Sequence, residues 1–275
     1  MKKLWSYVAI PATALAVLTG SVAWVVLLRP FYYVQIGPLG VCQASGLTPD
    51  QARAAYNDVM DYCLGLRPDF AAGVLPFSAE GASHFADVRV LFILNLAFLA
   101  LSVAVLSSLR AACLRQKAKL PRLAGRTPGF WAACALGSVI LIAAALAATD
   151  FDRAFTVFHG IFFPGKENWL FDPATDPVIL LLPEEFFRNC AIAIAASLLL
   201  LCLVLILTGR RQKKIKRVAA LLQKKYPRLP RGFCGAPTYR SLGCQSQSAK
   251  IMSSRSPKIQ LFIILYHAPF FSCFP

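Results

Sequence analysis

Acidic residues are few in this chain, and long stretches of it have none. The sequence has 13 Asp and Glu among 275 residues, against 29 Lys and Arg, and a formal net charge of +16. No acid precedes Asp50, follows Glu185 or lies between Asp87 and Asp150. A basic excess suggests nucleic-acid binding when it is spread over a soluble surface. Here the charges are segregated along the chain, which indicates anionic membrane lipid rather than nucleic acid as the partner.

Charge is also absent from the middle of four long apolar runs. The runs cover about residues 7–28, 88–109, 129–148 and 190–208, and Arg89 stands only at the entrance of the second. Each can cross a bilayer as a helix, which takes about 20 apolar residues. No alternating β-barrel pattern is present, so helices are the viable spanning structure. The first run is longer than a signal-peptide core and ends in large residues, so we interpret it as a retained anchor.

The segregation of charge predicts the sidedness of these spans. Only seven Lys and Arg belong to the outer segments or their edges, and the positive-inside rule places the other, basic regions in the cytoplasm. The sequence therefore predicts an all-α membrane protein with four transmembrane helices and an extracytoplasmic cap of helices and loops. The segments between and beyond the spans are a cytoplasmic N-terminus at 1–6, outer segments at 29–87 and 149–189, a basic cytoplasmic loop at 110–128, a basic amphipathic segment at 209–231 and an atypical tail at 232–275 without an assigned role.

Helix signals are clear in the first outer segment. Thr48 is a candidate cap, and Pro49 suits the first turn of a helix that continues to about Gly65. A second short helix is expected to begin at Ser78 and to lead through His84 into the second span. In the second outer segment, prolines between residues 169 and 187 predict irregular backbone.

Several common catalytic motifs are missing. The chain has no Gly-rich phosphate loop, no nucleophilic-serine elbow and no CxxC pair. Its nine cysteines show no framework spacing. Cys42 and Cys63 share the first outer segment, where they could pair or stay free as small apolar groups.

Histidine is scarce as well, and two of the three histidines lie in the outer segments. His84 precedes Asp87 by three residues, so on a helix both share a face, where the carboxylate can fix the imidazole tautomer. His159 lies in an aromatic run. Each also has a plainer interpretation, His84 as an exposed residue at a helix start and His159 as an interfacial residue among headgroups. Together they predict one lipid-facing site.

Metal-binding and structural roles stay open for the same segments. His84, His159 and Asp172 could form a zinc site, although no H-x-x-x-H pair supports it. The acids Asp172, Asp176 and Glu184 could equally be solvated loop charges or ion-pair partners of nearby arginines.

An ordered set of motifs resembles one family closely. The motifs are His84-Phe85-x-Asp87-Val88, Phe158-His159-x-x-Phe162-Phe163, Trp169-x-Phe171-Asp172-Pro173 and Pro183-Glu184-x-Phe186-Phe187. In this order, over about residues 5–220, they resemble the lipoprotein intramolecular transacylases, the Lit family. The tail after about Gly232 matches nothing associated with that family.

The resemblance implies a reaction, partners and a location. Lit enzymes move the sn-2 acyl chain of a diacylated lipoprotein to the α-amino group of its N-terminal cysteine, which gives the lyso form. The implied catalytic pair is His84 and His159, and no cofactor is consumed. The implied partners are the diacylated lipoprotein and membrane lipid. The implied location is the bacterial cell membrane, with both termini cytoplasmic and the active site outside.

The chemistry of the residues is consistent with that reaction. A histidine with a pKa of about 6.5 can deprotonate an α-amine whose pKa is near 8. We expect Asp87 to orient His84, and Asn168 and Trp169 are candidate oxyanion donors. The acids expected to hold the second outer segment in shape are Asp172, Asp176 and Glu184. Which histidine is base and which is acid stays open, as does an acyl-histidine intermediate.

Two other functions are consistent with the residues. One is a metal-dependent membrane hydrolase or transferase that uses the same side chains. The other is a non-enzymatic four-helix sensor or accessory subunit whose outer segments bind a protein. Transport is disfavoured because no span carries a mid-membrane charge.

Overall fold

Helices are the only extended secondary structure in the part of the chain that the structure describes. The computed structural model describes residues 2–225, with side chains from 3 to 209, and has no β-strand in that range. Its helices are α1 (Lys2–Leu27), α2 (Pro30–Tyr33), α3 (Val41–Ser45), α4 (Pro49–Cys63), α5 (Ala79–Arg115), α6 (Pro128–Thr149), α7 (Phe151–Phe162), α8 (Val178–Leu181) and α9 (Glu184–Lys225). The predicted all-α class is confirmed.

Four helices are long and apolar enough to cross a membrane: α1, α5, α6 and α9. Each contains one predicted span to within a residue. Side chains such as Val139, Leu141 and Ile142 of α6 are more than half exposed, as expected of surfaces that face lipid. Helix α5 has 37 residues, well beyond the roughly 20 that a bilayer needs. Its second turn, which carries His84, therefore lies before the span predicted to begin at Val88.

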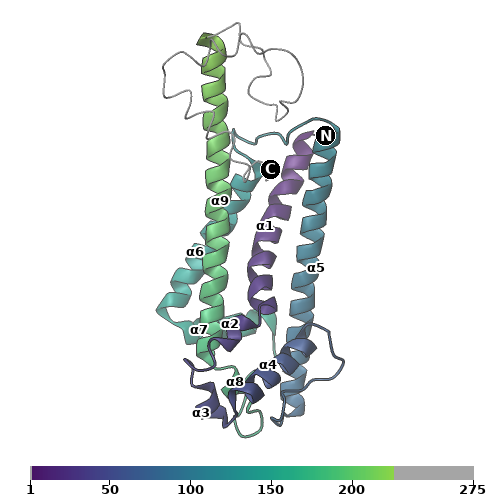
Figure 1. Cartoon of the computed structure of the whole chain (residues 1–275), viewed down its shortest axis with the longest axis vertical. Coiled ribbons are helices and arrows are strands. Elements are labelled where there is room, and N and C mark those ends of the chain that lie inside the picture. The colour runs from purple at the N-terminus through teal and green to yellow at the C-terminus, as the bar shows by residue number, and fades with distance from the viewer. Residues whose placement is uncertain (1, 226–275) are drawn as a thin grey trace, which may run out of the picture. The chain divides into compact units, whose positions relative to one another are not determined.

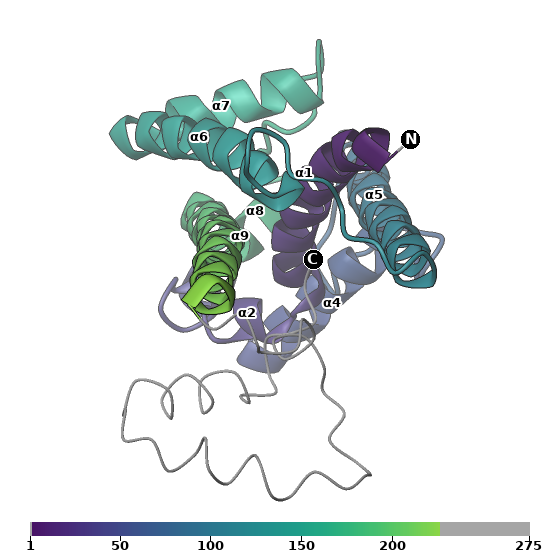
Figure 2. The ribbon, with the colours of Figure 1, turned by 90° about the horizontal axis from the view of Figure 1, so that it is seen from above.

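Helix α1 lies among the other spans and contacts them directly. It packs against α5 and α6, and Figure 2 shows it between α5 on one side and α6 and α9 on the other. Asn95 Nδ2 of α5 donates to the Thr19 carbonyl (3.2 Å), and Trp24 Nε1 donates to Ser197 Oγ of α9 (3.0 Å). Hydrogen bonds of this kind contribute to helix association in lipid.

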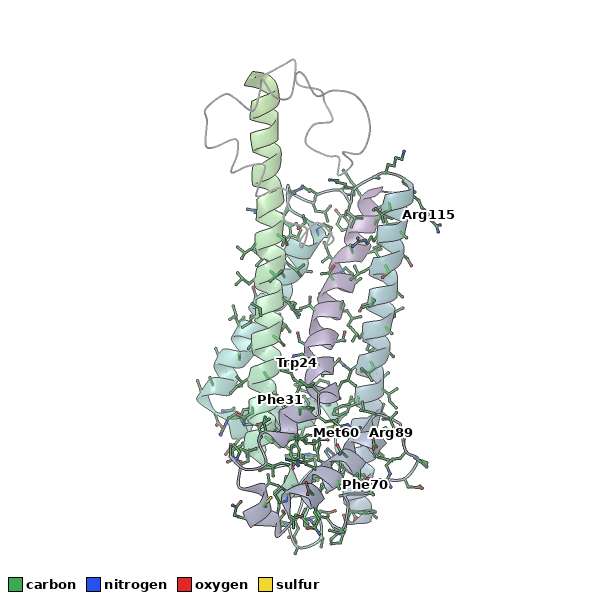
Figure 3. The ribbon with its side chains drawn as sticks, viewed as in Figure 1. Trp24, Phe31, Met60, Phe70, Arg89 and Arg115 are labelled. Carbon is green, nitrogen blue, oxygen red and sulfur yellow. The ribbon has the colours of Figure 1, made fainter. Side chains whose placement is uncertain are left out.

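The short helices gather at one end of the spans and enclose the main apolar core (Figure 1). Tyr32 of α2 is fully buried, its ring stacks on Tyr56 of α4 at 3.8 Å, and its hydroxyl donates to the Leu181 carbonyl of α8 (2.8 Å). One side chain thus joins three elements of the cap. Figure 3 shows Arg89 at this end of α5 and Arg115 at the other end.

Both predicted helix starts in the first outer segment are confirmed. Thr48 and Gln51 form a capping box, in which each side chain accepts from the other's backbone N–H. Ser78 caps α5 by accepting from the Gly81 N–H (2.9 Å). The short helix expected at Ser78 is the first part of α5, which continues without a break into the span.

The second outer segment contains two helices that the sequence analysis does not predict, α7 and the single turn α8. Helix α7 follows α6 directly, and Asp150 caps it by accepting from the Arg153 N–H (2.9 Å). The stretch predicted to be irregular, residues 169–187, is irregular as far as residue 177. Beyond it the prediction is wrong in part, because α8 occupies Val178–Leu181 and α9 begins at Glu184, directly after Pro183.

Two further expectations concern the cysteines and the C-terminal part. Cys42 and Cys63, whose pairing the sequence leaves open, are both free thiols. The predicted basic segment at 209–231 is helical as far as Lys225, and its place on the membrane surface stays a prediction. The tail at 232–275 lies outside the described residues.

The second outer segment is docked onto the start of α5. Asp176, only 4% exposed, accepts from the Ser78 N–H through Oδ1 (2.8 Å) and from the Thr175 hydroxyl through Oδ2 (3.1 Å). A carboxylate here meets N–H groups that lack helical partners and the positive end of the helix dipole. Gly81 makes the approach possible, because a Cβ at this position would lie 2.2 Å from Asp176 Oδ1.

Gly81→Ala is expected to weaken this docking. The added methyl group must displace a buried carboxylate, and overpacking of this kind costs about 1–3 kcal/mol of stability. Melting of the purified protein in detergent measures the loss. Gly160→Ala in α7 is the matched control, because a Cβ at Gly160 meets nothing within 4 Å. A Gly81→Ala melting temperature as high as that of the control would contradict the docking contact.

Candidate active site

The two histidines of the outer segments lie side by side. His84 comes from the second turn of α5 and His159 from the last turn of α7. Their ring centroids are 5.9 Å apart with an interplanar angle of 30°, and each residue is 6% exposed. A buried polar residue is more informative than a buried apolar one. This pair of imidazoles is therefore the first candidate for the site.

Helix α7 places His159 on its protein-facing side. Phe155, His159 and Phe163 follow one another at four-residue spacing, and the first two rings are 4.3 Å apart. On the other side, Phe158 and Ile161 are 47% and 68% exposed. The helix is thus amphipathic, with an apolar outer face and the imidazole inside.

A backbone carbonyl fixes the tautomer of His159. Its Nδ1 lies 2.8 Å from the Phe155 carbonyl oxygen. A carbonyl oxygen can only accept, so Nδ1 carries the proton and the neutral imidazole keeps its lone pair on Nε2. His159 therefore presents Nε2 as a proton acceptor.

Aromatic rings enclose both imidazoles. Trp169 stacks on His159 with a centroid distance of 4.3 Å and an angle of 24°. Phe163 and Phe171 lie edge-on to His84 at 4.9 Å and 5.5 Å. The loop after α7 thus covers residues of both helices, which gives the pair an apolar surrounding.

Lys166 is a site residue that the sequence analysis missed. Its Nζ donates to both carboxylate oxygens of Asp87, at 2.6 Å and 2.7 Å. We expected Asp87 to bond to His84, but its hydrogen bonds go to Lys166 and, at 3.4 Å, to Asn168 Nδ2. Lys166 is the only lysine of the second outer segment, which could have marked it as an ion-pair partner for one of the acids. Its partner Asp87 lies 79 positions away in the sequence, however, beyond any local spacing rule.

A family model describes most of this chain. The model of the lipoprotein intramolecular transacylase Lit matches residues 7–187. The chain belongs to this family. The family, the enzyme class of acyltransferase and the integral membrane fold expected from the sequence are confirmed, which favours the transacylase over the two alternative functions.

Solved structures of a Lit protein have the same fold. The membrane-integral Lit of Bacillus cereus gives a TM-score of 0.69 at 25% identity and covers 79% of this chain and 98% of its own. Two further structures of that protein each have one histidine replaced, by arginine or by alanine. They give TM-scores of 0.65 and 0.63 at 23% identity, and cover 80% and 78% of this chain and 95% and 96% of their own. No curated protein matches the chain.

In this Lit family member both histidines are neutral at neutral pH. Burial, together with the nearby imidazole of His159, lowers the pKa of His84 to about 4, although Asp87 and Asn168 act to raise it. Burial likewise lowers the pKa of His159, against the effect of its hydrogen bond to the Phe155 carbonyl. The cause is loss of hydration, which disfavours the charged imidazolium. Both rings are therefore ready to accept a proton.

Asp87 is held as a carboxylate beside this pair. Its partial burial raises the pKa, but the hydrogen bonds from Lys166 and Asn168 lower it by more, so the pKa of Asp87 lies below its ordinary value. A charge-assisted pair of this kind has a well-defined geometry. Asp87 thus supplies a fixed negative charge close to His84.

The two candidate oxyanion donors have partners already. Trp169 Nε1 donates to the Lys166 carbonyl (3.1 Å). Asn168 Nδ2 lies 3.4 Å from both Ser83 Oγ and Asp87 Oδ2. Either group would have to exchange a hydrogen bond in order to stabilise an oxyanion.

The remaining predicted acids have partners other than the two histidines. Asp176 anchors α5, and Asp172 Oδ1 accepts from the Ala174 N–H (2.9 Å) within the loop. Glu184 begins α9, where hydrogen bonding with Asp152 raises its pKa. An open pocket of about 440 Å³ is lined by Asp152, Phe155, Thr156, Trp169, Leu170, Phe171, Asp172, Ile179 and Glu184. It adjoins the rings that surround His159.

The alternative zinc set is not assembled. Across the side chains that the structure describes, no three His, Cys, Asp or Glu residues are grouped so that they could hold a metal ion. His84 and His159 are together, but Asp172 does not complete a set with them.

The low pKa of His84 makes stability depend on pH. Because the folded pKa of about 4 lies below the unfolded value of about 6.5, the unfolded chain binds this proton first as pH falls. The fold therefore loses stability between about pH 6.5 and about pH 4, by at most about 1.4 kcal/mol per pH unit from this group. In detergent, the melting temperature should fall further between about pH 7 and about pH 5 for the wild type than for His84→Gln. Equal losses would contradict a buried neutral His84.

Proposed function

We propose that this chain moves the sn-2 acyl chain of a diacylglyceryl lipoprotein to the α-amino group of the lipoprotein's N-terminal cysteine. The observation that carries the proposal is the buried histidine pair, 5.9 Å apart between ring centroids, in a member of the Lit family. The product is an N-acyl, S-monoacylglyceryl lipoprotein, the lyso form.

The reaction requires one proton to be removed and one to be returned. The α-amine, with an ordinary pKa near 8, must be neutral to attack the ester carbonyl. As the C–N bond forms and the ester C–O bond breaks, the nitrogen loses a proton and the glycerol oxygen gains one. His159 presents a free Nε2 to this chemistry, and His84 lies beside it. Two positioned imidazoles can accept and donate these protons without help from water.

Orientation is the second requirement. The acyl donor and the amine belong to one molecule, so holding them in register supplies much of the rate. The open pocket of about 440 Å³ next to Trp169 and Phe155 is within the size range of small-molecule sites. It offers space for the glyceryl-cysteine end of the substrate beside Phe155 and Trp169, the rings that contact His159.

Exclusion of water is the third requirement, since the same site could otherwise hydrolyse the ester. His84 and His159 are each 6% exposed, and the rings of Phe163, Phe171 and Trp169 contact them. An acyl carbonyl at the histidine pair would meet apolar surface rather than solvent, which favours transfer over hydrolysis.

The outer face of α7 suits contact with lipid. Val157, Phe158, Ile161 and Phe162 are each about half exposed or more. An apolar helix face of this kind lies at the level of headgroups and acyl-chain ends. This position would place His159 near the depth of an sn-2 ester in a bilayer.

The same proposal includes the side of the membrane on which the histidine pair lies. The cap carries all the acids of the chain, whereas the loop between α5 and α6 is basic, so the cap with its histidine pair is expected outside the cell and the termini inside.

Reporter fusions test this sidedness. Alkaline phosphatase, which is active only outside the cytoplasm, should be active when fused after Glu167 and inactive when fused after Lys117. The reverse pattern would place the histidine pair in the cytoplasm and overturn the assignment.

Histidine substitution tests the activity itself. In cells that lack other N-acylating enzymes, the chain should convert diacyl lipoproteins to the lyso form, as seen by mass spectrometry of N-terminal lipopeptides. His84→Ala and His159→Ala should each lower conversion by about 100-fold or more. His267→Ala is the matched control, as the third histidine of the chain. Full activity of either site variant would contradict the two-histidine scheme, and zinc-restored activity after chelation would favour the metal-dependent alternative.

A further inference from the structure

Two buried polar atoms at the site have no hydrogen-bond partner. Across the described side chains, three buried nitrogen or oxygen atoms are unpartnered, and two of them are His84 Nδ1 and Asn168 Oδ1. Buried polar atoms are nearly always satisfied, so an unpartnered pair at one site calls for a physical reason. An imidazole N–H donor and a carboxamide oxygen acceptor are chemically complementary.

Asp87 determines which end of the Asn168 carboxamide faces His84. Asn168 Nδ2 lies 3.4 Å from Asp87 Oδ2, and the carboxylate can only accept. The NH₂ group must therefore face Asp87, which leaves Oδ1 for another donor. The Asn168 side chain is also close enough to His84 to raise its pKa, against the larger effect of burial.

We propose that Asn168 is a positioning residue for His84. In the reactive state its Oδ1, which has no partner in the structure, accepts from the equally unpartnered His84 Nδ1–H. Its Nδ2 donates to Asp87, and Lys166 holds Asp87 in place. This series of contacts, the relay Lys166–Asp87–Asn168–His84, rests on the proposed function of the histidine pair. Its consequence is that His84, like His159, keeps its lone pair on Nε2. Both imidazoles are then held at Nδ1 by an oxygen, the Asn168 carboxamide in one case and the Phe155 carbonyl in the other.

Lys166 gives the relay its fixed end. Its Nζ is within 2.7 Å of both Asp87 oxygens, and its carbonyl accepts from Trp169 Nε1, whose ring stacks on His159. The same short loop thus contacts both histidines. When His84 accepts a proton on Nε2, its imidazolium faces Asp87 and the Asn168 oxygen, which favour the charge. His159 and Lys166 are the nearby groups that oppose it.

Nitrogen NMR of histidine-labelled protein in detergent tests the relay directly in the wild type. The His84 signals are identified by their loss in His84→Gln. At neutral pH the expected tautomer has the proton on Nδ1 and a lone pair on Nε2. The opposite tautomer would overturn the relay, whatever the behaviour of any variant.

Substitution of the relay residues tests its effect on catalysis. Asn168→Leu should lower kcat by up to about 100-fold, the scale of a misplaced catalytic group. It should also move the lower acidic limb of kcat/KM, which reports His84 and lies below the limb set by the substrate amine, to lower pH, because the oxygen that favours protonated His84 is gone. Asn168→Asp, which keeps an oxygen acceptor and adds negative charge, should move that limb to higher pH. Asp87→Asn should lower kcat as well, because it removes the carboxylate that orients the carboxamide.

Two matched controls separate positioning from general damage. Asn189→Leu removes an amide that donates to Gln35 (2.7 Å), and Asp58→Asn breaks an ion pair with Arg67 (2.6 Å) in the cap. Neither should move the acidic limb. A relay variant whose pH profile matches its control would overturn the proposal. If the wild type fails to convert lipoprotein, the proposed function is wrong, but the tautomer of His84 measured by NMR still tests the relay. If wild type converts lipoprotein but has the other tautomer, the relay alone fails.

Discussion

The contact between Asp176 and the start of α5 positions the rest of the site. It joins residues 98 positions apart and brings the second outer segment onto the helix that carries His84. The backbone N–H groups at a helix start lack helical partners and lie at the positive end of the dipole, so a buried carboxylate is stabilised there. Gly81 leaves room for it. The ion pair between Lys166 and Asp87, one turn after His84, fixes the same segment at a second point.

Burial of the histidine pair has a cost and a use. An imidazole in an aromatic surrounding loses hydration of its charged form, so both rings are neutral and His84 is a weak base. In the proposed reaction the same surroundings would keep water from an acyl group. Polar atoms such as Asn168 Oδ1 then matter more than they would at the surface, because little solvent competes for His84 Nδ1. Burial of these residues therefore disfavours the charged imidazolium but also favours acyl transfer over hydrolysis.

The architecture places reactive groups on rigid elements close to the membrane. His84 lies on the extension of a spanning helix, and His159 lies on α7, which follows α6 with only Asp150 between them. Groups held on helices keep their geometry better than groups on loops. The irregular segment supplies Lys166, Asn168 and Trp169, which contact the histidines and their neighbours from outside the helices. This division suits a reaction whose substrate is anchored in lipid and whose two reacting groups belong to one molecule.

Features of this protein that depend on local pattern could be predicted from the amino-acid sequence. Apolar length fixed the four spans, cap residues such as Thr48 and Ser78 fixed two helix starts, and the scarcity of histidine directed attention to His84 and His159. Their motifs were also sufficient to indicate the family. The tertiary structure decided what depends on contacts between distant residues. Helix α7 was missed because its aromatic residues suit an interface as well as a helix. Asp87 was expected to bond to His84 because they are three residues apart, but a lysine 79 positions away is its charged hydrogen-bond partner. A periodic pattern shows which residues share a face, whereas only folding decides which distant charge arrives there.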